Sequence, residues 1–140
     1  MTNEKVEDIP SEIVVNQKQS CLEFLFSQGN NRTLSFEFLR VHSPSAEVVG
    51  HGKGQEVVQV GKKDVKIVKL EHIGNYGVKP KFSDDHNTGI YSWSYLSWLL
   101  DNKDLLWDKY LKKLEDIGAS RIKDELQPNL KNTDGEFKKK

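Results

Sequence analysis

The feature that most constrains this sequence is a change in the spacing of its apolar residues close to Ser92. Before that point, apolar and polar residues alternate in short runs, the two-residue period of half-buried β-strands. After it, apolar residues recur every three to four positions, as on one face of an α-helix. The chain is therefore predicted to be an α+β domain: a small antiparallel or mixed β-sheet, built from two hairpin-like meanders, with a C-terminal helical segment packed on it.

The first meander is predicted from three alternating runs, at residues 12–18, 20–26 and 33–36. Turn-forming residues at 28–31 separate the second run from the third. The closer apolar spacing that follows predicts a short helical turn ending before Pro44, because the residue before a proline disfavours helix. Ser45 is then placed to cap a further turn through Val48, and residues 50–54 are predicted to form a loop.

The second meander is predicted at residues 63–73, 78–82 and 89–91, with Pro80 favouring an edge or bulged position. Apolar residues at helical spacing then predict one helix from Trp93 to Leu100 and a second that begins near Asp101 or Asn102. Gly118 is placed to end the second helix.

With 140 residues, the chain has room for one domain. We expect a flexible tail at residues 1–9, the domain at 10–118 and a polar, disordered tail at 119–140. The 21 basic and 21 acidic residues cancel, so no global field attracts nucleic acid or an anionic membrane. A start without a signal-peptide core, together with the lone Cys21, favours a reducing, cytoplasmic location.

Familiar catalytic and metal-binding spacings are missing from the sequence. It contains no H-x-x-x-H, C-x-x-C, H-x-D, H-x-E or G-x-S-x-G, and the glycines between residues 50 and 61 do not have phosphate-loop spacing. No catalytic residue is therefore assigned.

The polar loop at residues 83–89 carries two interpretations. Asp84 and His86 could fix a turn through hydrogen bonds, with Gly89 permitting a tight bend, or His86 could face a ligand or metal together with Asp84 or Asp85. Trp98 lies off the apolar stripe of its predicted helix. It is either part of the core or an exposed anchor for a partner.

Three stretches together carry a family resemblance: residues 10–13, residues 39–47 and the segment FSDDHNTGIYSW at 82–93. The sequence resembles the gamma-butyrobetaine hydroxylase-like N-terminal domain (DUF971) over about residues 10–100. In the carnitine-pathway hydroxylases this module precedes an iron- and 2-oxoglutarate-dependent catalytic domain. It also occurs with Mrp-type ATPases that handle iron–sulfur clusters.

The family's zinc site uses a Cys-Pro-Cys-x-x-Cys motif and a later histidine. Here the three cysteine positions hold Ser43, Ser45 and Val48, and only His86 matches a ligand. Because thiolates supply most of the binding free energy in such sites, the departure disfavours zinc.

The resemblance implies a stand-alone, non-catalytic accessory or protein-interaction module linked to iron or iron–sulfur metabolism. Its partner would be an Mrp-type ATPase or an oxygenase acting in trans, and not nucleic acid or membrane. The alternatives are a module that binds iron or another metal through His86 and nearby carboxylates, and an uncharacterised enzyme. The expected ligand or partner patch consists of Arg40, His42, Ser43, Ser45, Asp84, Asp85, His86 and Trp98.

Overall fold

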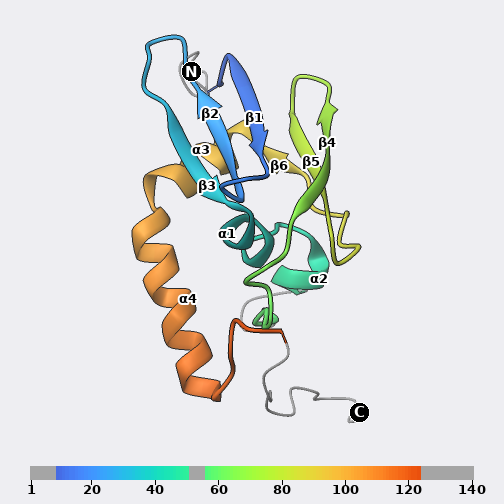
Figure 1. The fold of residues 1–140 in the computed structure, drawn as a ribbon, viewed down its shortest axis with the longest axis vertical. Helices are drawn as coiled ribbons and strands as arrows, with labels where there is room; N and C mark the ends of the chain where they lie inside the picture. Colours follow the sequence, from blue (N-terminus) through green and yellow to red (C-terminus); the bar gives the residue numbers. More distant parts are fainter. Residues whose placement is uncertain (1–8, 51–55, 124–140) are drawn as a thin grey trace.

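The computed structural model describes residues 9–50 and 56–123 (Figure 1). Most of the predicted N-terminal tail, the greater part of the loop predicted at 50–54, and residues 124–140 of the predicted C-terminal tail lie outside this range. Within it, the α+β class is confirmed. The helices and strands form two three-stranded antiparallel sheets with two short helices between them and two longer helices after them.

The first sheet is the predicted N-terminal meander. Its strands pair in sequence order, with Val15 opposite Leu22 and Leu22 opposite Leu34. Leu22, Phe24 and Leu34 are buried because alternate residues of a strand point to the same face. The strands are β1 (Glu12–Asn16), β2 (Cys21–Leu25) and β3 (Arg32–Ser35).

Two short helices follow, α1 (Phe36–Val41) and α2 (Ala46–Val49). A serine caps each one. The hydroxyl of Ser35 accepts a hydrogen bond from Phe38 N, and that of Ser45 accepts one from Glu47 N. The predicted cap at Ser45 is therefore confirmed, and Ser43 and Pro44 form the connection between the helices.

The second sheet has the order β4 (Ile67–Ile73), β5 (Gly77–Phe82), β6 (Tyr91–Ser92). Its first strand begins at Ile67 instead of residue 63, since the amide of Lys63 bonds to the carbonyl of Arg121 and not to a strand. Pro80 lies in the middle strand, but β6 pairs only with Gly77 and Val78. Pro80 therefore has a paired strand on one side only, which its missing N–H allows.

The helices after the sheet are α3 (Trp93–Asp101) and α4 (Lys103–Ile117). Ser92 caps α3 through Tyr95 N. Gly118 ends α4 as predicted, and it does so in the left-handed conformation, with φ of 69°. The longest described helix, α4, has 15 residues, and none of the described helices combines the length and hydropathy needed to cross a membrane.

One main core joins both sheets to α1 and α3, and its largest fully buried side chain is Tyr91. Figure 1 shows the two sheets at the top of the molecule, α1 and α2 below them, and α4 extending downward along the left side. A smaller cluster of Val41, Tyr110 and Leu114 attaches α4 to α1.

The described chain continues past Gly118 and folds back on itself. The amides of Gly61 and Lys63 bond to the carbonyls of Ser120 and Arg121 at 2.9 and 3.0 Å. The Arg121 guanidinium holds the buried Glu37 carboxylate through two hydrogen bonds of 2.7 and 2.8 Å. Residues 119–123, the first part of the predicted tail, thus pack against the domain.

Candidate functional site

The two polar loops singled out in the sequence lie against each other. The connection between α1 and α2 meets the loop between β5 and β6 through two side-chain contacts. The hydroxyl of Ser43 lies 2.9 Å from Nε2 of His86, and the hydroxyls of Ser45 and Thr88 lie 2.7 Å apart. Segments about 43 positions apart in sequence are therefore joined by hydrogen bonds.

His86 is the centre of this contact, and it is buried, with 6% of its surface exposed. Its Nδ1 lies 3.0 Å from a carboxylate oxygen of Glu47. Burial lowers the pKa of His86, and the positive charge of Arg40 lowers it further, against the opposing effect of Glu47. The neutral ring has one N–H. Because a carboxylate only accepts, Nδ1 donates to Glu47 and Nε2 accepts from Ser43.

Glu47, His86 and Ser43 have the connectivity of an acid–histidine–serine triad. A substrate, however, has no access to the serine of this trio. Ser43 has no exposed surface, and a Cβ built on Gly89 would lie 2.3 Å from its hydroxyl oxygen. A nucleophile needs an electrophilic atom within about 3–3.5 Å along an open path, and the backbone of Gly89 fills that space. The geometry makes this trio a hydrogen-bonded joint between two loops.

A charged cluster lies beside the joint. One carboxylate oxygen of Asp84 accepts from Arg40 Nε at 3.0 Å and from Lys62 Nζ at 2.6 Å. Burial alone would raise the pKa of Asp84, but the hydrogen bond from Lys62 and the charge of Arg40 outweigh it and hold the pKa below its usual value. Arg40 also donates to the side chain of Gln59 at 3.0 Å. The cluster ties α1 to residues 59–62 and to the β5–β6 loop.

The residues present do not fit the family's zinc centre. Ser43, Ser45 and Val48 offer two neutral hydroxyls and a hydrocarbon, and both nitrogens of His86 are already hydrogen-bonded. Among residues 9–50 and 56–123, no group of three or more His, Cys, Asp or Glu side chains is arranged to hold a metal ion. We therefore derive no chemistry through zinc.

The remaining residues of the expected patch do not take part in these contacts. Asp85 is exposed at a positive φ of 69° within the β5–β6 loop. His42 caps the end of α1, where its Nδ1 bonds to the carbonyl of Phe38 at 2.9 Å and its ring lies near Phe38. Trp98 is on α3, 49% exposed and stacked on Tyr95. The structure thus joins Arg40 to Asp84, Ser43 to His86 and Ser45 to the same loop. It leaves the side chains of His42, Asp85 and Trp98 outside these contacts.

Several residues of the site were not selected from the sequence. Glu47 is the acid that orients His86, and Lys62 is the second cation on Asp84. The sequence gives a signal for Glu47 alone, two positions after the capping Ser45. Gly89 was expected to permit a tight bend, but its role is to let the backbone approach Ser43.

A family pattern and several solved structures match this chain. The sequence pattern of the family described as gamma-butyrobetaine hydroxylase-like, N-terminal, matches residues 13–97. No curated protein matches. An NMR solution structure is 43% identical with a TM-score of 0.72, and the match covers 84% of this chain and 93% of that one. A second NMR structure is 39% identical with a TM-score of 0.71 and is covered over 99% of both chains.

A crystal structure from Acidithiobacillus ferrooxidans, of a DUF971 protein of unknown function, is 34% identical with a TM-score of 0.57. The match covers 69% of this chain and 97% of that one. The resemblance noted in the sequence is therefore confirmed by a family pattern and by solved structures. The chain belongs to the gamma-butyrobetaine hydroxylase-like N-terminal domain family, also known as DUF971.

Proposed function

We propose that this chain is a non-catalytic protein-interaction module that docks through Trp98. The observation that carries the proposal is the setting of this side chain. It is half exposed on α3, yet its ring is held in stacked geometry on Tyr95, with centroids 5.9 Å apart and planes 19° apart. An exposed tryptophan in a fixed orientation loses little conformational freedom on binding, and tryptophan is enriched among residues that dominate interfaces.

The support under Trp98 is itself anchored. The hydroxyl of Tyr95 donates to the carbonyl of His42 at 2.6 Å, which ties the aromatic stack to the end of α1. His42 precedes Ser43, which the joint holds to His86. A partner docked on Trp98 would therefore contact a rigid surface. The hydrogen bonds between the two polar loops would keep that surface in place.

The partner follows from the family setting. We propose an Mrp-type ATPase that carries iron–sulfur clusters, with a 2-oxoglutarate-dependent oxygenase as the second candidate. The family resemblance supports this choice, since these are the proteins with which the domain is combined elsewhere.

Calorimetric titration of the purified chain against each purified candidate from the same genome tests the proposal. We expect saturable binding that Trp98→Ala weakens at least about tenfold, the effect of removing a hot-spot side chain. The matched control is Tyr76→Ala, which removes a 60% exposed aromatic ring from the β4–β5 turn. Absence of binding by the wild-type chain to both candidates would reject the partners. Unchanged binding by Trp98→Ala would reject the surface.

A further inference from the structure

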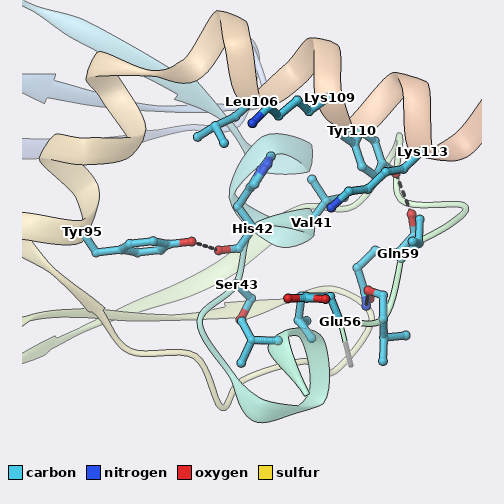
Figure 2. Close-up of a pocket in the computed structure, with 14 residues that line it drawn as sticks. Val41, His42, Ser43, Glu56, Gln59, Tyr95, Leu106, Lys109, Tyr110 and Lys113 are labelled. Carbon is cyan, nitrogen blue, oxygen red and sulfur yellow. Dashed lines mark hydrogen bonds between the residues drawn. The ribbon is translucent and has the colours of Figure 1, made fainter. Parts of the chain in front are cut away.

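A small pocket lies where α1 and α2 face the middle of α4 (Figure 2). Its volume is about 180 Å³, and residues 56–59 form another wall. Val49 and Val57 lie at the exposed rim, with 41% and 52% of their surfaces open to solvent. The aliphatic lining consists of Val41, Val48, Val49, Val57, Val58 and Leu106.

Two exposed lysines of α4 are among the residues that line the pocket. Lys109 and Lys113 are one helical turn apart on α4, and Figure 2 shows the ammonium end of Lys113 turned toward Val41. Within the described part of the chain, neither ammonium has a hydrogen bond or an ion pair. Lys112 differs, because it pairs with Asp116 at 2.8 Å. Glu56 lies across the pocket from α4, so the lining carries two positive charges and one negative charge.

The neighbouring polar groups are already engaged with the protein. The hydroxyl of Tyr95 donates to the carbonyl of His42 at 2.6 Å, and that of Tyr110 to the carbonyl of Gln59 at 2.7 Å. Burial lowers the pKa of His42, and its Nδ1 bonds to Phe38. Histidine is therefore neutral here near pH 7, and the positive charge of the pocket comes from the lysines.

We propose that this pocket binds a short aliphatic monocarboxylate, with the hydrocarbon body against the valines and the carboxylate on Lys109 and Lys113. The aliphatic walls would bury the body, and the lysines are donors without a partner in the described structure. Sites for drug-sized molecules measure roughly 300–1,000 Å³, so a pocket of about 180 Å³ favours a short chain. This inference does not rest on docking at Trp98, which is not among the lining residues.

The test is an NMR titration of the full chain with isocaproate, a branched six-carbon acid. We expect binding with a Kd on the order of 1 mM, as suits a ligand of so few atoms. The shifted signals should be those of the pocket methyl groups, with Val48, Val58 and Leu106 foremost. Isocaproamide, which has the same body without the charge, should bind at least about fivefold more weakly, since it cannot pair with the lysines.

Variants distinguish the effect of the two pocket lysines from the effect of any positive charge on α4. Lys109→Gln combined with Lys113→Gln should weaken isocaproate binding at least about fivefold, while Lys112→Gln, the control on the same helix, should leave it unchanged. Trp98→Ala should also leave it unchanged, which keeps this outcome distinct from that for the protein partner. Equal binding of acid and amide, an equal effect of Lys112→Gln, or no shifts at the pocket would each overturn the proposal. The amide spectrum of every variant shows that it is folded.

Discussion

The Nε2 atom of His86 lies 2.9 Å from the hydroxyl oxygen of Ser43, and Ser43 is fully buried. This hydrogen bond joins the α1–α2 connection to the β5–β6 loop, and the amide of Ser45 donates to the same hydroxyl at 3.2 Å. The Ser43 hydroxyl therefore donates to one group and accepts from another.

Ser43→Ala should lower the free energy of unfolding by about 1–3 kcal/mol, because it leaves the nitrogen of His86 and the amide of Ser45 without their partner in a buried place. Urea denaturation measures this change. Ser94→Ala, at an exposed position of α3, is the matched control and should stay within about 0.5 kcal/mol of wild type. A loss for Ser43→Ala as small as that of the control would show that the joint contributes little to stability.

Gly89→Ala should cost about 1–3 kcal/mol, because its new Cβ would lie 2.3 Å from the Ser43 oxygen. The same substitution made in a Ser43→Ala background should cost less, since the clashing oxygen has gone. Urea denaturation of the two single variants and the double variant forms the cycle that isolates this term. Strictly additive losses would mean that the alanine at 89 is disfavoured for another reason.

Trp93→Ala should lower the free energy of unfolding by about 3–5 kcal/mol, as truncation of a buried aromatic ring does. Trp93 is 7% exposed and its indole N–H donates to the carbonyl of Asn75 at 2.9 Å. Trp98→Ala is the internal comparison on the same helix and should cost less than about 1 kcal/mol, because its ring is half exposed. Similar losses for the two would contradict the division between core and surface tryptophan.

Removal of residues 129–140 should barely change the melting temperature, whereas removal of residues 119–140 should lower the free energy of unfolding by about 1.5–3 kcal/mol. The longer deletion takes away Arg121 and leaves the buried Glu37 carboxylate without its guanidinium. Thermal and urea unfolding of both truncated chains measure the difference. Arg121→Gln in the full chain distinguishes loss of the ion pair from loss of the segment.

Stability should fall as the pH is lowered from 7.5 to 5.5. The folded-state pKa values of His42 and His86 are lowered, chiefly by burial, and lie below the unfolded value of about 6.5. Between the two values the unfolded chain binds more protons, so acid favours unfolding, and the stability is fully present above the unfolded pKa. The urea midpoint should therefore be lower at pH 5.5. His42→Gln combined with His86→Gln should reduce that difference, and His72→Gln, at an exposed position, is the control.

The local features of the fold were predictable because they depend on neighbours in sequence. Ser45 caps α2 and Gly118 ends α4 by short-range backbone geometry, and both were expected. The start of β4 was placed four residues early, since alternation at Lys63 cannot reveal that its amide bonds to Arg121. Periodicity indicates which face of a strand is buried, and tertiary contacts decide where the strand begins.

Some residues of the site could be selected beforehand, but the contacts between them could not. The family resemblance grouped Ser43, Ser45 and His86, and the structure brings them together. It did not identify Glu47 as the partner of His86, because a place in the first turn of a helix does not say which distant residue the acid contacts. It did not identify Lys62 as a partner of Asp84, because exposed lysines are common and carry no spacing signal. Trp98 stayed ambiguous until its exposed fraction was known, since one residue off an apolar stripe fits either a core or a surface position.

The pairing of Glu37 with Arg121 also affects the order in which the parts of the chain can fold during synthesis. Domains form as their residues emerge, N-terminal parts first. Here the buried Glu37 of α1 pairs with Arg121, which is synthesised 84 residues later. Until Arg121 has left the exit tunnel, α1 can approach its final place only with an uncompensated charge. The segment that carries Arg121 therefore completes the fold, and the domain reaches its final state only after this segment has emerged from the ribosome.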